Sequence, residues 1–364
     1  MTKGAGCKKI LFIFCLAAAS AVLLFCSRSF ADGARKGIEL CAERLIPSLF
    51  PSMVIAEIAV ASSLGKIISK PLAKPISRLF NISREAVVPF LLGMIFGFPV
   101  SVRAAVALCN DGKIDESELC RLALFSVIPS PAFFISAVGE GLFGSLKFGV
   151  FLYLSALLSC VTVGVASRRL FKDLRGRYYC ENFARGGRSV SFVSAVTSSA
   201  RALFAVCSFV VLFSAIIEPL SELLESLGLN KSLTVLLLGT LEMTNGASLA
   251  STLGASGAPI AAAILGFSGI SLLCQLLAID VTGRVRVKAY IVARLFIAGF
   301  MLLLSLGFVF VFGESAFSEP VAPSFILYSG GRLSLSLLAL FLCALFMALY
   351  EGKRKIFGKT IYKR

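Results

Sequence analysis

The stretch VVPFLLGMIFGFPVSVRAAVALC, residues 87–109, is an apolar block interrupted in its middle by Gly97-Phe98-Pro99. A block of this length and composition is typical of a helix that enters a membrane. Glycine and proline together break a helix and free backbone N–H and C=O groups. In a bilayer, such groups are satisfied only by other protein groups or in a water-lined cavity. The stretch therefore predicts a discontinuous helix in a membrane protein.

The remainder of the chain has the same apolar character. Of its 364 residues, 57% are hydrophobic and 15% are charged, with a mean hydropathy of +0.90. A soluble domain carries roughly a quarter charged residues. Because the apolar residues fall in long blocks and not in alternating faces, the composition excludes a soluble enzyme and predicts an all-α polytopic membrane protein.

The polar composition narrows the function further. The net charge of +16 is explained by basic residues in cytoplasmic loops, so it does not indicate a nucleic-acid partner. The chain contains no His, which excludes Ser-His-Asp and Cys-His catalysis. Its eleven Cys form no C-x-x-C pair, so neither a zinc site nor a disulfide framework is expected. We expect a protein that is not an enzyme and that holds no cofactor or metal.

The apolar blocks are arranged as a repeat. In each half, a span is followed by an amphipathic stretch, two interrupted blocks and a further span; the stretch is basic at 66–84 and acidic at 218–225. The opposite signs predict halves inverted in the membrane. The blocks lie at 10–25, 45–65, 87–109, 122–138, 148–165, 202–217, 232–251, 258–279, 289–312 and 333–350.

We divide the chain into five segments and expect the first span to be retained. They are an N-terminal span (1–36), a first repeat (37–166), a basic cytoplasmic linker (167–199), a second repeat (200–312), and a C-terminal span with a basic tail (313–364). If 87–109 and 232–251 are re-entrant hairpins and the other eight blocks cross, most basic residues face the cytoplasm. The exception is 28–44, whose basic residues this topology places outside.

Paired discontinuous segments in inverted repeats are typical of secondary transporters. The broken helices present N–H groups that suit an anion or a polar ring, although such breaks also occur in purely structural helices. The candidate substrate-binding residues follow the breaks. They are Gly97, Phe98, Pro99, Ser101 and Arg103 in the first half, and Thr244, Asn245, Gly246, Ser268, Ser271 and Gln275 in the second.

Four ionisable residues lie inside the apolar blocks, where charge is costly and usually faces a cavity or a partner. We expect Arg103 to bind a substrate carboxylate, and Glu57 or Glu242 to carry a coupling proton or bind a coupling cation. Arg294 is expected in structural pairing. The alternative is that the two Glu and two Arg only neutralise one another in salt bridges.

These residues carry a resemblance to a known family. Its pieces are LIPSLFP (45–51) with Glu57, GFPV (97–100) with Arg103, LEMTNG (241–246), FSGIS (267–271) with Gln275, and the stretch 288–295. Together they are similar to the nucleoside-recognition, or Gate-domain, membrane proteins, and within them to the YlbJ-like (SpoVV) sporulation branch. The likeness covers roughly residues 37–310.

The resemblance implies a multi-pass protein of the cell membrane or the outer forespore membrane that moves dipicolinate, a pyridine dicarboxylate, during sporulation. A nucleoside or nucleobase carrier, or a sporulation scaffold that transports nothing, are the alternatives. The chain departs from the family at Ser101, where Gly is frequent, and at 126–131, where Asn or Thr is frequent. It also lacks the His that the family commonly has near Leu273 and Ile297.

Overall fold

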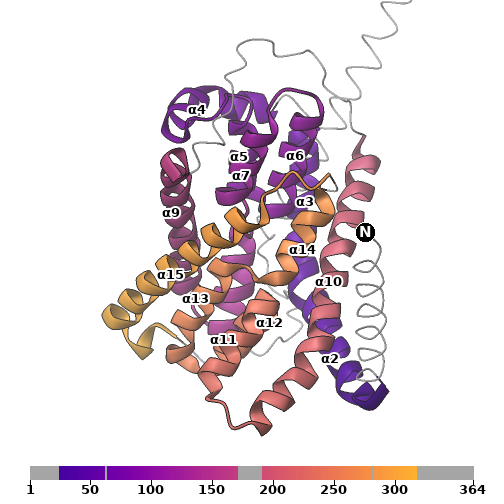
Figure 1. The fold of residues 1–364 in the computed structure, drawn as a ribbon, viewed down its shortest axis with the longest axis vertical. Coiled ribbons are helices and arrows are strands. Elements are labelled where there is room, and N and C mark those ends of the chain that lie inside the picture. Colours follow the sequence, from indigo (N-terminus) through magenta and orange to yellow (C-terminus); the bar gives the residue numbers. More distant parts are fainter. Residues whose placement is uncertain (1–23, 62–63, 171–190, 281, 318–364) are drawn as a thin grey trace, which may run out of the picture.

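The computed structural model describes residues 24–61, 64–170, 191–280 and 282–317. Within these ranges every regular element is a helix, and most helices run along the long axis of the molecule (Figure 1). The predicted span 333–350, nearly all of the span 10–25 and most of the basic linker lie outside the described residues.

Four segments of the described chain are long and apolar enough to cross a membrane. Three are single helices: α9 (Leu146–Leu170), α10 (Phe192–Ser226) and α15 (Val287–Phe312). The fourth is built from α13 (Gly257–Phe267) and α14 (Gly269–Ile279) in succession. These segments, together with the absence of strands from the described ranges, confirm an all-helical protein of membrane type.

Segment 28–44 is helical and packs along α10 (Figure 1). Helix α2 (Ser27–Leu40) continues through a π-helical turn, η1 (Cys41–Leu45), into α3 (Ile46–Ala61). Two glycines of α2 face α10: a Cβ added at Gly33 would lie 2.5 Å from the Ser214 carbonyl oxygen, and one at Gly37 would lie 2.8 Å from Ser214 Cβ. Small residues that allow two backbones to approach closely are typical of helix pairs in membranes.

The acidic stretch 218–225 is not a separate surface element, contrary to the prediction. Helix α10 runs through it as 35 continuous residues, despite Pro219. The packing of α2 against this part of α10 compensates for the one hydrogen bond that a proline removes. Polar contacts hold the same pair of helices together, because Lys36 Nζ lies 2.5 Å from Glu218 Oε1 and Ser29 Oγ donates to the Glu222 carboxylate at 2.8 Å.

The basic stretch at 66–84 is mostly helical, as predicted. It forms α4 (Leu64–Phe80), which lies across one end of the bundle, beyond the ends of α5, α7 and α9 (Figure 1). Its last residue, Phe80, is buried and stacks on Phe125 with ring centroids 5.0 Å apart, and Arg168 donates to the Leu79 carbonyl oxygen at 3.0 Å. These contacts fasten α4 to the bundle at its C-terminal end.

The blocks predicted to be interrupted are broken helices. Block 87–109 forms α5 (Val87–Phe96) and α6 (Phe98–Asn110), which meet at Gly97 with a φ of +89°. Block 122–138 falls within α7 (Glu116–Phe125), a non-helical segment and the π-helix η2 (Phe133–Glu140), followed by α8 (Gly141–Phe143). Helices α13 and α14 meet at Ser268, whose φ is +71°. The chain therefore breaks near the middle of each block.

The fourth break lies two residues before its predicted position. Block 232–251 forms α11 (Lys231–Leu241) and α12 (Met243–Ser251), which meet at Glu242, so Thr244-Asn245-Gly246 is the first turn of α12 and not the break. The reason is local: the extended Glu242 places its carboxylate on the Asn245 N–H and thereby starts the new helix. Short 3₁₀ turns at Gly254–Ser256 and Glu314–Ala316 complete the described elements.

Two of the broken blocks fold back on themselves. A Cβ added at Gly93 would lie 2.7 Å from Ser101 Cβ, which places α5 and α6 side by side. A Cβ added at Gly246 would lie 2.3 Å from Gly239 Cα, which does the same for α11 and α12. Each half of the described chain thus contains one helical hairpin, with tips at Gly97 and Glu242, and one further broken helix.

Candidate functional site

In the first half, the hairpin tip lies against the broken helix. A Cβ added at Gly97 would lie 2.8 Å from the Ser130 backbone nitrogen, so only glycine fits there. One turn further, Ser101 Oγ donates to Ser126 Oγ at 2.9 Å, and both side chains are buried. The tip of the α5–α6 hairpin therefore contacts the non-helical segment between α7 and η2.

The second half repeats this arrangement. A Cβ added at Gly269 would lie 3.1 Å from both the Leu241 carbonyl oxygen and the Met243 nitrogen. The tip of the α11–α12 hairpin therefore contacts the break between α13 and α14. In each half, therefore, the hairpin tip lies beside the break in the other helix. At both places the backbone lacks some of its helical hydrogen-bond partners.

Arg294, on α15, joins the two halves. Its guanidinium donates to the Val127 carbonyl oxygen in the first-half break and to Ser268 Oγ in the second-half break, the latter at 3.4 Å. The same group lies 4.9 Å from the centre of the Tyr290 ring, and both side chains are buried. Arg294 was predicted to form a structural pair. Among the described residues it forms no ion pair, and its guanidinium instead donates hydrogen bonds to a backbone carbonyl and a hydroxyl.

Glu242 is buried at the second hairpin tip and is held by uncharged donors. One carboxylate oxygen accepts from the Asn245 backbone N–H at 2.7 Å and from its side-chain amide at 2.9 Å, and the other accepts from Thr244 Oγ1 at 3.0 Å. The Asn245 amide also donates to Ser214 Oγ on α10, at 2.6 Å. In the described part of the chain no basic side chain forms an ion pair with Glu242. A negative charge at this position would be favoured by the N-terminus of α12, which Glu242 caps.

Glu57 and Arg103 form an ion pair, which Ser198 completes. Arg103 Nη2 lies 2.6 Å from Glu57 Oε1, and the same nitrogen donates to Ser198 Oγ at 2.6 Å. Ser198 Oγ donates in turn to Glu57 Oε1 at 2.9 Å. The three residues come from α3, α6 and α10, and the Arg103 and Glu57 side chains are 33% and 22% exposed. This pair is accessible to solutes, in contrast to Glu242 and Arg294.

Arg103 lines an open cleft of about 700 Å³ between α6 and α10, with Ile279 of α14 also in its wall. The polar lining comes from two helical stripes: Arg103 and Asn110 on α6, and Ser194, Thr197, Ser198 and Arg201 on α10. The second stripe was missed by the sequence analysis. Its spacing of i, i+3, i+4 and i+7 was a usable signal, but Ser194, Thr197 and Ser198 fall within the predicted basic linker (167–199) and Arg201 at the start of the predicted second repeat.

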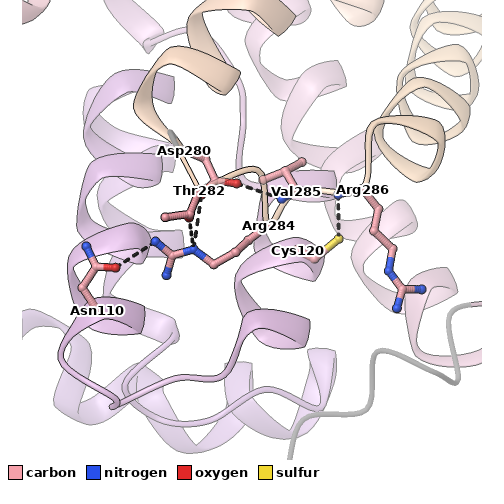
Figure 2. A network of polar contacts seen from close by, with 7 residues as sticks. All are labelled: Asn110, Cys120, Asp280, Thr282, Arg284, Val285 and Arg286. Atoms are coloured by element: carbon pink, nitrogen blue, oxygen red, sulfur yellow. Dashed lines mark hydrogen bonds and ion pairs between the residues drawn. The ribbon is translucent and has the colours of Figure 1, made fainter. Parts of the chain in front are cut away.

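The cleft ends near a polar loop between α14 and α15, which contacts the first half of the chain (Figure 2). Arg284 donates to Asn110 Oδ1 at 2.8 Å and lies 3.4 Å from Asp280 Oδ1. The other Asp280 oxygen accepts from the Val285 N–H at 2.8 Å. The Arg286 N–H donates to Cys120 Sγ at 3.4 Å, while the Arg286 side chain points away from the network (Figure 2). The loop therefore fixes the position of Asn110 at the end of α6.

The predicted substrate-binding residues fall into two sets. Arg103 lines the cleft and forms an ion pair with Glu57. The others lie at the hairpin tips and in the broken helices, where Thr244 and Asn245 hold Glu242 and where Gln275 donates to Ser271 Oγ at 3.3 Å. Phe98 and Pro99 form the first turn of α6, and Phe98 is buried. The structure therefore does not bring Arg103 into the contacts that hold Glu242.

Comparison with known proteins identifies a relative of this chain. It is 27% identical over 303 residues to the sporulation integral membrane protein YlbJ of Bacillus subtilis, an alignment that covers 72% of this chain and 74% of the relative. The match confirms the predicted resemblance to the YlbJ-like sporulation proteins. No protein-family model and no solved structure matches the chain.

Proposed function

We propose that this chain, a membrane protein of the YlbJ-like sporulation family, moves a small anion across a membrane. The anion we propose is dipicolinate, and the membrane is the outer membrane of the forespore. The observation that carries the proposal is that Arg294 joins the two helix breaks, each of which contacts a hairpin tip, in a molecule that also has a basic cleft along α6. Discontinuous helices that meet inside a bundle are how many transporters build a substrate path.

The topology that we propose is an inverted repeat with about eight crossing spans. The α5–α6 hairpin enters from the cytoplasm and the α11–α12 hairpin from the opposite side. The contacts between Arg168 and Leu79 and between Arg284 and Asn110 join segments that this topology places inside. Those between Lys36 and Glu218 and between Phe143 and Phe317 join segments that it places outside. All four contacts are consistent with this topology.

The ion pair at Lys36 accounts for the one exception to the positive-inside pattern. This basic residue of 28–44 lies 2.5 Å from Glu218, and the helix that carries it packs along the acidic end of α10. Arg44 of the same segment donates to the Ala137 carbonyl oxygen at 3.3 Å. Basic side chains that are held by local partners do not have to face the cytoplasm to be accommodated, so 28–44 can lie outside.

The energetics of anion transport indicate a coupled mechanism. Moving one charge against the membrane potential costs about 2.3 kcal/mol per 100 mV, and a dianion doubles this cost. Glu242 is our candidate for the coupling group, because it is buried at a hairpin tip and its oxygens face only uncharged donors. A proton bound there, or a cation in its place, would couple movement of the tip to movement of charge.

A deletion strain tests the proposal. Sporulating cells that lack the protein should form spores with little dipicolinate, and wild-type protein should restore the content while Arg103→Ala should not. Arg35→Ala is the matched control, because Arg35 is 74% exposed and its ion pair is with Asp32, on its own helix. Normal spore dipicolinate in the deletion strain would refute the function.

A nucleoside carrier is the second candidate. It is favoured by the amides of Asn245 and Gln275, which lie in the hairpin and broken helix of the second half and would suit a neutral ring. In that case Arg103 would be dispensable, and labelled nucleosides would be taken up by cells that make the protein. A scaffold, the third candidate, predicts an unchanged phenotype when Glu242 and Arg103 are both replaced by alanine.

A further inference from the structure

A second guanidinium, that of Arg201, lines the cleft that holds Arg103. Ser198 and Arg201 are three residues apart on α10, which puts them about 4.5 Å apart along the helix axis and on the same face. Since Ser198 Oγ lies 2.6 Å from Arg103 Nη2, the two basic residues are neighbours across the cleft.

The two guanidinium groups differ in how they are neutralised. Arg103 is paired with Glu57 at 2.6 Å. Arg201 forms no ion pair within the described residues, and none of the described residues that line the cleft is acidic. The rest of the polar lining is made of neutral hydroxyl and amide groups, from Ser194, Thr197, Ser198 and Asn110. The cleft therefore has an excess of positive charge.

We propose that this cleft binds a small dianion through two carboxylates, one on Arg103 and the other on Arg201. The inference rests on the proposed function and names the residues that recognise its substrate. Guanidinium groups bind carboxylates through charge-assisted hydrogen bonds, often two at once, and Ser194 and Thr197 supply further donors beside Arg201. A cleft of about 700 Å³ is within the range that holds small ligands.

Glu57 has a defined part in this site. Its carboxylate occupies Arg103 and accepts from Ser198, so it holds the position that a substrate carboxylate takes. A bound dianion displaces Glu57 from Arg103, and release of the dianion restores the internal ion pair. Glu57 therefore competes with the ligand, and removal of its charge strengthens binding.

Calorimetric binding of dipicolinate and of picolinate, its single-carboxylate analogue, to the purified full-length protein tests the inference. We expect wild type to bind dipicolinate more tightly than picolinate. Arg201→Gln should weaken dipicolinate binding about 10- to 100-fold, the equivalent of one charge-assisted contact, and should remove most of the preference for dipicolinate over picolinate. Arg201→Lys should keep part of the preference. Glu57→Gln should tighten the binding of both acids.

The control is Arg286→Gln, since this exposed side chain points away from the polar network near the same end of the cleft (Figure 2). Its affinities should equal those of wild type, and its melting temperature provides the reference for correct folding. Undiminished dipicolinate binding in a folded Arg201→Gln variant would overturn the two-carboxylate site alone. A wild-type protein that binds neither acid would overturn the proposed function together with this inference.

Discussion

Arg294 shows how one residue couples the two halves of the molecule. Its guanidinium reaches the Val127 carbonyl oxygen of one broken helix and Ser268 of the other. Both groups lie at breaks, where the backbone lacks its helical partners and where the positive φ of Ser268 is maintained only by its surroundings. Arg294 therefore satisfies a backbone acceptor that would otherwise be buried alone.

Replacement of Arg294 by methionine tests this role. Methionine approximates the length of the side chain but leaves the Val127 carbonyl without its donor, a loss of about 1–3 kcal/mol in the free energy of unfolding. The melting temperature of the detergent-purified variant should fall clearly. Arg35→Met is the matched control, and equal melting temperatures for the two variants would contradict the assigned role.

At the scale of elements, close helix packing decides where α2 lies. The glycines of α2 allow its backbone to approach Ser214 on α10, whereas Gly299 and Gly307 on α15 have nothing within 4 Å of an added Cβ. The same substitution thus meets opposite environments on two helices. A comparison between them separates packing from helix propensity.

Gly37→Ala should destabilise the protein, because its Cβ would lie 2.8 Å from Ser214 Cβ and the helices must separate. Gly299→Ala should be neutral or stabilising by up to about 1 kcal/mol, since alanine favours a helix more than glycine does. Melting temperatures of the two variants check the prediction. A stabilised Gly37→Ala variant would show that α2 does not pack on α10 in this way.

The elements differ in how far the sequence predicts them. The interrupted blocks were predictable because Gly and Pro break helices by local rules, and the structure places breaks at Gly97, within 126–131 and at Ser268, which Gly269 follows. The break at Glu242 was misplaced because a side-chain cap decides it. The packing of α2 on α10 and the position of Arg201 in the same cleft as Arg103 depend on contacts between distant segments, which periodicity alone does not encode.

The same limit applies to the candidate site. The four ionisable residues inside the apolar blocks were identified from the cost of charge there. Their partners were not: Glu57 pairs with Arg103, whereas Glu242 and Arg294 use hydroxyl, amide and carbonyl groups. The partners of these residues depend on which helices pack together, so they could be identified only from the structure.

At the scale of the whole molecule, the proposed topology assigns each end of the bundle to one side of the membrane. In a background with the native cysteines replaced, Lys36→Cys and Lys231→Cys should react with an impermeant maleimide in intact cells. Lys113→Cys and Arg286→Cys should react only after permeabilisation, because they lie at the end that holds the polar loop. Labelling of all four positions in intact cells would contradict the inverted repeat.

We propose that the molecule moves a small anion along a path that includes Arg103. The most direct measurement is the uptake of labelled dipicolinate into liposomes that contain the purified protein. We expect wild type to take up dipicolinate, excess unlabelled dipicolinate to inhibit this uptake, and nucleosides to leave it unchanged. Arg103→Ala should lose the uptake and Arg35→Ala should retain it. Uptake of nucleosides instead, or dipicolinate uptake that Arg103→Ala leaves intact, would contradict it.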